Sequence, residues 1–135
     1  MHIVLVEPEI PGNTGNIARL CAGTGIELHL VRPLGFSTDN KYLKRAGLDY
    51  WHLVTVHYHD RFDEVLEMYP NRTFYFCSTK ASRTHCDVAY PPDAFLVFGK
   101  ESAGLPHDLL AAHSHVRAFL ILSRALHEKV QGAVL

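Results

Sequence analysis

Residues 95–106, FLVFGKESAGLP, are the stretch that best indicates how this chain folds. Four apolar, β-prone residues, Phe95 to Phe98, lead into a loop of small and charged residues bounded by Gly99 and Gly104, and a helix-like run follows Pro106. A buried strand that passes through a glycine loop into a helix is typical of the edge where open α/β sheets bind ligands, because glycine lets the backbone approach a ligand closely. For such a loop taken alone, a plain strand–turn–helix connection is the more frequent explanation.

Outward from this stretch, apolar runs alternate with amphipathic ones along the whole chain. The predicted strands cover residues 3–6, 26–31, 50–56, 73–77 and 95–98. The first predicted helix begins near residue 17, and three more cover residues 41–47, 61–69 and 107–112. This alternation predicts an α/β fold, with a mostly parallel sheet and helices on both faces. The length of 135 residues fits one domain, 1–135, with its own core.

Composition narrows the setting in which the chain works. The chain is 47% hydrophobic and 20% charged, which is ordinary for a globular protein. Its net charge is −1, so the charge balance alone does not indicate a nucleic-acid partner. Three cysteines, Cys21, Cys77 and Cys86, form no CxxC pair, which favours reduced thiols in a cytoplasmic protein over a disulfide framework or a zinc site. No signal peptide and no apolar run of about 20 residues is apparent, so we expect no membrane partner.

A second loop of similar character follows the first predicted strand. Glu7 to Asn16 contains two prolines, two glycines and two asparagines, which predicts a structured loop with Asn13 or Thr14 capping the next helix. Arg19 then falls near the first helical turn, where a rigid fork of donors suits phosphate or a hydroxyl. An ordinary surface arginine explains the position about equally well.

Two further clusters carry weaker signals. Lys41, Lys44 and Arg45 make a small basic patch among aromatic residues, a pattern that contacts phosphates and bases or simply forms a solvated helix face. His57 and His59 form a His-x-His pair at what is expected to be an exposed strand end. Because no third ligand is suitably spaced, no metal site is predicted.

Three stretches together resemble one family. VEPEIPGNTGNIARLCAGTGIELHLVRPLGF (6–36), KRAGLDYW (44–51) and FGKESAGLP (98–106) are similar to the SPOUT-class, trefoil-knot RNA methyltransferases. The most similar members are the YibK/TrmL type, which methylate the ribose 2′-hydroxyl of the wobble cytidine or uridine of tRNA. The resemblance spans roughly residues 1 to 110. It implies a SPOUT α/β knot and a homodimer that uses S-adenosylmethionine and no metal, with tRNA as partner.

The resemblance also assigns roles to particular residues. The family's first motif falls on Asn13, Gly15 and Arg19, which implies that Arg19 acts at the ribose 2′-hydroxyl while Asn13 and the Glu7 loop shape the pocket. The cofactor-binding residues that it implies are Cys77, Ser78, Gly99, Glu101, Gly104, Ala118 and Ala125. The residues that it implies for tRNA contact are Glu7, Lys41, Lys44 and Arg45.

The last part of the chain departs from the family pattern. Family members carry an Ile-Pro-Met-like strand, an Arg-Ser-Leu-Asn-Leu-Ser-like loop and a long final helix, whereas residues 116–135 contain VRAFLILSRALHEKVQGAVL. Residues 116–118 stand in for the strand and 123–126 for the start of the loop. The knot, the last helix, the dimer and activity all depend on this stretch in the family.

Two other functions therefore stay open on the sequence alone. One is a truncated or catalytically impaired homologue that only binds RNA or cofactor. The other is a flavodoxin-like domain for another nucleotide, although the Glu101 carboxylate disfavours an anion at the glycine loop. Titration with S-adenosylmethionine separates an active enzyme from a remnant that has lost cofactor binding, because such a remnant gives no heat.

Overall fold

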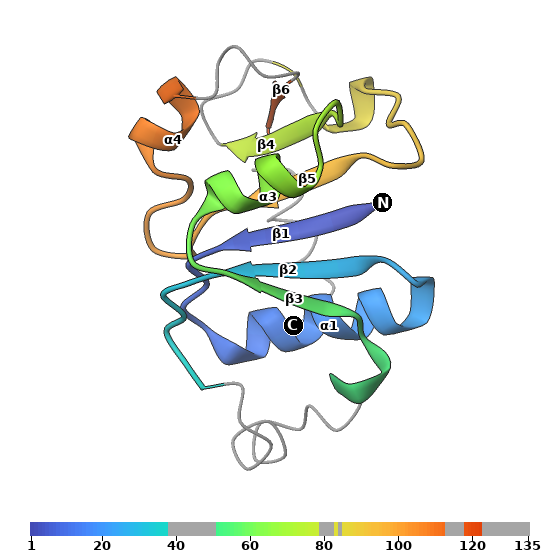
Figure 1. Cartoon of the computed structure of the whole chain (residues 1–135), viewed down its shortest axis with the longest axis vertical. Coiled ribbons are helices and arrows are strands. Elements are labelled where there is room, and N and C mark those ends of the chain that lie inside the picture. Colours follow the sequence, from blue (N-terminus) through green and yellow to red (C-terminus); the bar gives the residue numbers. More distant parts are fainter. Residues whose placement is uncertain (38–50, 79–82, 84, 113–117, 123–135) are drawn as a thin grey trace.

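The computed structural model describes residues 1–37, 51–78, 83, 85–112 and 118–122. Within these residues, six parallel strands form one sheet in the order β3-β2-β1-β5-β4-β6 (Figure 1). The strands are β1 (His2–Val6), β2 (Glu27–Val31), β3 (Val56–His59), β4 (Phe74–Ser78), β5 (Phe95–Phe98) and β6 (Ala118–Leu122). The helices are α1 (Pro11–Thr24), α3 (Phe62–Met68) and α4 (His107–Ala112), with short 3-10 turns at Trp51–Leu53 and His85–Asp87. The predicted parallel α/β fold is confirmed.

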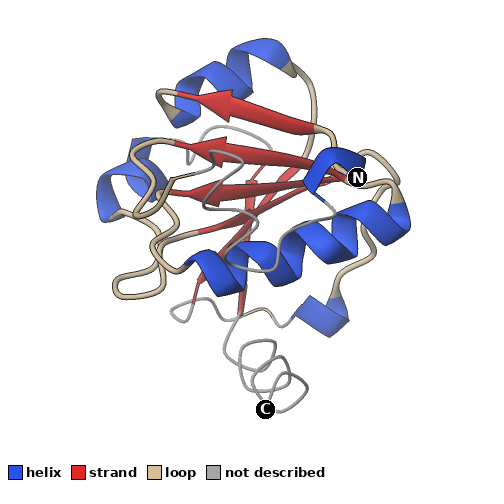
Figure 2. Ribbon diagram, turned by 90° about the horizontal axis from the view of Figure 1, so that it is seen from below, coloured by secondary structure: helices blue, strands red, loops and turns tan. Residues whose placement is uncertain are grey.

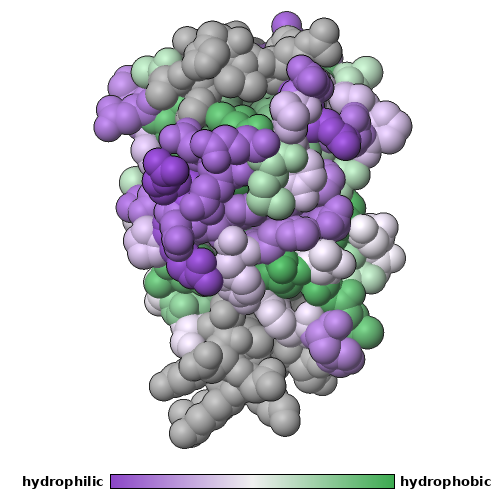
Figure 3. Space-filling view, in the orientation of Figure 1, coloured by the Kyte–Doolittle hydropathy of each residue, from purple (hydrophilic) through white to green (hydrophobic). Residues whose placement is uncertain are grey.

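Helices cover both faces of the sheet, as predicted (Figure 2). Alternate residues of β1 point to opposite faces because a strand has a period of two. Val4 and Val6 belong to the core beneath α3 and α4, whereas Ile3 and Leu5 belong to the core beneath α1. Hydrophilic side chains dominate the outer surface on the α3 side (Figure 3). None of the helices in the described part of the chain has the length and apolarity needed to cross a membrane.

Helix α1 begins earlier than the sequence suggested, so the prediction of a loop through Asn16 is wrong. Ile10 is the N-cap residue and Pro11 is the first helical residue, which places Asn13 and Thr14 inside the first turns instead of at the cap. Proline is favoured at this position because its fixed φ suits a helix and its missing N–H would have no helical partner. The helix ends at Thr24, and its C-cap residue Gly25 has a φ of 76° and donates its N–H to the Cys21 carbonyl.

The third strand is also displaced from its predicted position. A strand was expected at 50–56, but residues 51–53 form a 3-10 turn and β3 covers Val56–His59. Two histidines lowered the apparent hydrophobicity of this segment, yet His59 is buried in the sheet. The expectation of an exposed strand end at His57 and His59 is therefore wrong.

Several predictions fall at the C-terminal end of the description or outside it. The strand expected at 116–118 is instead β6, Ala118–Leu122, paired in parallel with β4. The expected helix at 41–47, with Lys41, Lys44 and Arg45, lies outside the described residues, as do Ala125, the expected loop at 123–126 and the last helix. The expected knot depends on those residues and stays a prediction.

A row of buried histidines crosses three strands on the α3 side of the sheet. His2 Nδ1 lies 3.0 Å from His29 Nε2, and His29 Nδ1 lies 3.0 Å from His59 Nε2. His29 is fully buried, and burial, followed by the nearby His57, His2 and His59, lowers its pKa to about 3. Burial is also the main cause that lowers the pKa of His2 and of His59. The folded chain therefore holds this row in its neutral form at pH 7.

This row predicts that the protein loses stability as the pH falls below about 6.5, the ordinary histidine value. The unfolded chain then binds protons that folded His2, His29 and His59 resist, so the free energy of unfolding falls by about 1.4 kcal/mol per pH unit for each proton. Glu27 and Glu64 oppose the effect, because they raise the pKa of His2 and His59 respectively, whereas His57, Arg72, Arg32 and the N-terminus add to it.

Urea unfolding at pH 7.5, 6.0 and 5.0 measures this slope. His29→Gln, which keeps hydrogen-bonding groups but no titrating ring, should give a shallower slope than the parent chain. His52→Gln changes an exposed histidine and should leave the slope as it is. A free energy of unfolding that stays constant between pH 7.5 and 5.0 would contradict the prediction.

Candidate functional site

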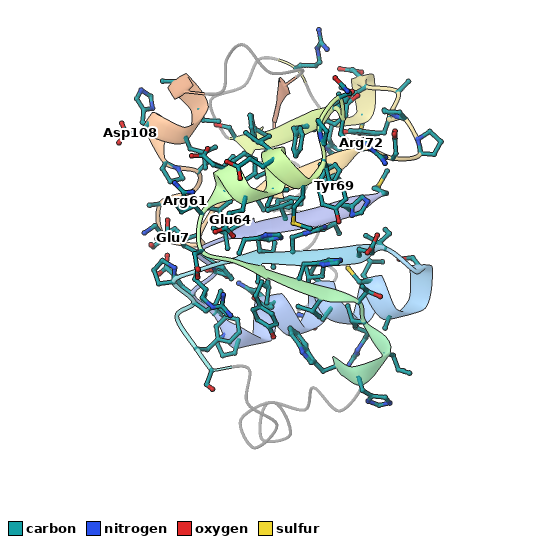
Figure 4. All side chains as sticks on the ribbon, in the orientation of Figure 1. Glu7, Arg61, Glu64, Tyr69, Arg72 and Asp108 are labelled. Atoms are coloured by element: carbon teal, nitrogen blue, oxygen red, sulfur yellow. The ribbon has the colours of Figure 1, made fainter. Side chains whose placement is uncertain are left out.

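The carboxyl ends of the parallel strands meet at one edge of the sheet. The chain builds β1, β2 and β3 outward in one direction and then crosses to β4, so β1 and β5 flank the point where the strand order reverses. Glu7 follows β1 at this edge, Gly99 follows β5, and Ser78 ends β4. Figure 4 labels Glu7 here, with Tyr69 and Arg72 toward the opposite edge. Open α/β sheets bind ligands in the crevice at such a reversal.

Helix α1 presents a polar face beside this edge. Thr14, Gly15, Ala18 and Cys21 are buried against the sheet. Asn13, Asn16 and Arg19 are exposed and, at successive three-residue steps, lie on one side of the helix. The structure thus brings the predicted Asn13 and Arg19 together and adds Asn16, which the sequence analysis missed. The three-residue spacing could have revealed Asn16 if the helix had been started at Pro11.

The glycine loop closes on itself between Gly99 and Leu105. The Gly104 N–H donates to the Lys100 carbonyl at 2.8 Å, and Gly104 has a φ of 71°. A Cβ at Gly99 would lie 2.0 Å from the Gly104 carbonyl carbon and 2.1 Å from the Leu105 nitrogen. Gly99 is therefore required by the tight closure of the loop. At Gly104, by contrast, a Cβ would meet no atom of the described residues within 4 Å, so the loop borders open space in that part of the structure.

The two loops that follow β1 and β5 are joined by an exchange of hydrogen bonds. The Glu9 N–H donates to Glu101 Oε2 at 2.7 Å and the Ile10 N–H donates to Glu101 Oε1 at 3.3 Å. In return Glu9 Oε1 accepts from the Ser102 N–H at 3.3 Å and from the Ser102 hydroxyl at 2.5 Å. We call this exchange among Glu9, Ile10, Glu101 and Ser102 the clasp. The hydrogen bond from the Ser102 hydroxyl is the main cause that lowers the pKa of Glu9.

The clasp changes how Glu101 is understood. The family resemblance implied a cofactor contact, whereas in this structure both carboxylate oxygens bind backbone N–H groups at the start of α1. Sequence reasoning found Glu101 but missed Glu9 and Ser102. No local pattern links residues that lie about ninety positions apart in the chain.

The first loop is also held from the β2 side. Glu7 adopts a φ of 54° and donates its N–H to the Val31 carbonyl at 2.9 Å. The Gly35 N–H donates to the Pro8 carbonyl at 2.8 Å, and a Cβ at Gly35 would lie 2.8 Å from the Glu9 Cα. Glu7 itself is half-buried at the sheet edge, where Figure 4 labels it.

Of the remaining predicted cofactor residues, Cys77 and Ser78 lie at the carboxyl end of β4, whereas Ala118 lies beside its amino end. Ser78 is half-buried at the carboxyl end of β4, close to the edge where the loops meet. Cys77 is buried among Tyr75, Ala94 and neighbouring apolar side chains, and burial raises the pKa of its thiol to about 12. Ala118 pairs with Phe74 at the amino end of the sheet, whereas Leu122 pairs with Ser78. The register therefore separates Ala118 from the other predicted residues by the length of β4.

No group of three His, Cys, Asp or Glu side chains suited to a metal ion occurs among the described residues. His57 contacts Glu27 at 2.9 Å instead, and His59 belongs to the buried histidine row. Both histidines lie on the α3 side of the sheet and are engaged in packing there.

Comparison with protein-family models places residues 1–120 within the description "SpoU rRNA Methylase family". A Bacillus subtilis (strain 168) protein is 54% identical over 113 residues, which cover 82% of this chain and 71% of the relative. The tRNA (cytidine(34)-2'-O)-methyltransferase of Escherichia coli (strain K12) is 46% identical over 112 residues, covering 83% of this chain and 71% of that enzyme.

Solved structures agree with these sequence matches. A structure described as giving insight into 2-OH methylation of C/U34 on tRNA is 41% identical with a TM-score of 0.77, and the match covers 89% of this chain and 78% of that one. The SpoU methyltransferase AviRb of Streptomyces viridochromogenes, solved with the cofactor AdoMet, has a TM-score of 0.73 over 90% of this chain and 47% of its own. At 17% identity, AviRb supports the fold alone.

Proposed function

Because the chain belongs to the SpoU rRNA methylase family, we propose that it transfers a methyl group from S-adenosylmethionine to the ribose 2′-hydroxyl of the wobble cytidine or uridine of tRNA. The observation that carries this proposal is that hydrogen bonds join the residues leading into α1 to the closed glycine loop at one sheet edge. The tRNA (cytidine(34)-2'-O)-methyltransferases among its relatives support the choice of nucleotide.

The glycine loop and its surroundings fit an adenosyl cofactor. The backbone at Gly104 borders open space, and the half-buried Ser78 ends the neighbouring strand at the same edge. In this proposal the loop from Gly99 to Gly104 and Ser78 hold the cofactor, and the apolar Cys77 region packs beneath it. When bound, S-adenosylmethionine supplies a methyl group activated by a positively charged sulfonium.

Arg19 and Asn13 act on the other reactant. The Arg19 guanidinium carries a permanent positive charge and several donors in a fixed geometry. Held beside the ribose 2′-oxygen, it favours the negative charge that develops there during transfer. Asn13 and Asn16 offer amide groups that orient the ribose from the same helix face, and Glu7 borders the pocket. Positioning of this kind supplies much of the rate of a two-reactant transfer.

Incubation with isotope-labelled S-adenosylmethionine and unmodified tRNA tests the function. Nucleoside analysis should find 2′-O-methylcytidine or 2′-O-methyluridine at the wobble position. A tRNA with a 2′-deoxy nucleotide at that position is the matched control and should take up no label. Calorimetric binding of the cofactor without methyl transfer would instead support the non-catalytic alternative.

Two features of the proposal rest on the family resemblance. We propose that Lys41, Lys44 and Arg45 contact tRNA phosphates and that the active form is a cytoplasmic homodimer. Sedimentation measures the oligomeric state. Salt dependence of tRNA binding measures the phosphate contacts, because each lost contact lowers the slope by roughly one.

A further inference from the structure

The clasp places the Glu101 carboxylate against the two residues that lead into helix α1. The N-cap residue Ile10 makes no side-chain cap hydrogen bond, and no acidic residue lies in the first turn of the helix. The first N–H groups of a helix need acceptors, and the positive end of its dipole favours an anion. Here the Glu101 carboxylate meets the N–H groups of Glu9 and Ile10 from the loop that follows β5.

The return half of the clasp depends on the Glu9 side chain. Glu9 Oε1 accepts from both the N–H and the hydroxyl of Ser102, so the glycine loop is fixed to a residue two positions before α1. The two halves of the clasp fix the position of the proposed cofactor loop relative to the helix that carries Arg19. A helix is stiff, so a shift at Pro11 is transmitted to Arg19 about 12 Å along the axis.

The Glu9 carboxylate is not needed to hold its own backbone. That backbone is already fixed from the β2 side, where the Gly35 N–H donates to the Pro8 carbonyl and Gly35 packs against the Glu9 Cα. Glu9 is absent from the buried core, and its partners Glu101 and Ser102 are exposed. Loss of the side chain should therefore leave the fold intact and change the register between the loops.

We propose that Glu9 and Ser102 are positioning residues for methyl transfer, acting through the register of α1 and the glycine loop on the placement of Arg19. This inference rests on the proposed function. It predicts that loss of the clasp lowers the rate of methyl transfer within the bound complex more than the affinity for cofactor, because the residues that bind the cofactor remain in place. Misplacement of reacting groups by about 1 Å costs up to 10²-fold in rate.

Single-turnover transfer with saturating S-adenosylmethionine and tRNA tests the inference, alongside calorimetric cofactor affinity and thermal stability. Glu9→Ala should lower the rate by about 10-fold or more, while the Kd for cofactor changes by less than about 3-fold and the melting temperature is retained. Glu9→Gln keeps an acceptor for Ser102 and should restore most of the rate. Ser102→Ala should lower the rate, and the double variant should be no slower than Glu9→Ala, because the two act as one unit. Glu67→Ala, an exposed carboxylate on α3, is the control.

A Glu9→Ala rate within about 2-fold of the parent overturns the inference, as does a rate loss matched by an equal loss of cofactor affinity. If the parent chain transfers no methyl group, the proposed function fails, and amide hydrogen exchange judges the clasp separately. Glu9→Ala should then speed exchange at Ser102, and Ser102→Ala should speed it at Ile10 and in the first turn of α1. Unchanged exchange at those amides in both variants overturns the clasp as a positioning device.

Discussion

Arg19→Ala is expected to lower methyl transfer to tRNA by about 10²–10³-fold while the fold is retained. Arg19 is exposed on the polar side of α1, so its removal leaves no cavity in the core formed by Ala18 and Cys21. The loss comes from the charge that no longer favours the developing alkoxide. Single-turnover rates with both substrates saturating measure it, and circular dichroism and thermal unfolding report on the fold.

Arg61→Ala is a charge-matched control for this experiment. Arg61 is exposed at the start of α3, on the opposite face of the sheet from α1 (Figure 4). Its loss lowers the net positive charge by the same amount and should leave the transfer rate within about 2-fold of the parent, because Arg61 lies on the face of the sheet that α1 does not cover. If Arg19→Ala turns over as fast as Arg61→Ala, Arg19 has no part in the chemistry.

Gly99→Val is expected to abolish detectable cofactor binding and to lower stability. The Cβ of the new side chain would lie 2.0 Å from the Gly104 carbonyl carbon, so the loop cannot stay closed. Opening it removes the Lys100–Gly104 bridge and displaces Glu101 and Ser102 from the clasp. The expected cause is thus steric collision within the loop, and a positive φ has no part, since Gly99 is not among the residues with one.

Calorimetry with S-adenosylmethionine measures this effect, and tRNA affinity should fall far less. Gly23→Ala is the matched control, because a Cβ there meets nothing within 4 Å and the helical backbone accepts it. That variant should be as stable as the parent or slightly more stable. Equal losses of cofactor and tRNA affinity in Gly99→Val would mean that the loop serves only the fold.

Much of the fold follows from local sequence patterns. Phe95–Phe98 and His107–Ala112 form a strand and a helix with the predicted bounds, because Gly99 ends the apolar run and Pro106 precedes the helical one. The displaced β3 shows the limit of that reasoning. His59 is polar by composition, but it is buried because His29 on the next strand supplies its hydrogen bond.

In the candidate site, too, residues in local motifs could be predicted and residues joined only by the fold could not. Asn13, Arg19, Gly99 and Gly104 stand in recognisable motifs and could be found from the sequence. The partners of Glu9 could not, because Glu101 and Ser102 reach it only after β1 and β5 have paired. Local patterns also misjudged the start of α1, since neither Asn13 nor Thr14 caps the helix and Pro11 is its first residue.

The place of β5 in the sheet has a consequence for how the chain is synthesised. β1, β2 and β3 are made early and can pair with one another, but β4 touches β1 only through β5. Until Phe95–Phe98 has left the ribosome, the growing chain therefore carries a three-stranded piece, β1 to β3, and a separate β4 that has no strand to pair with among the described residues. Such long-range pairing slows folding and exposes strand edges to other chains. A nascent chain arrested before Phe95 should bind chaperones more than one that extends past β5, because the longer chain can join β4 to β1 through β5.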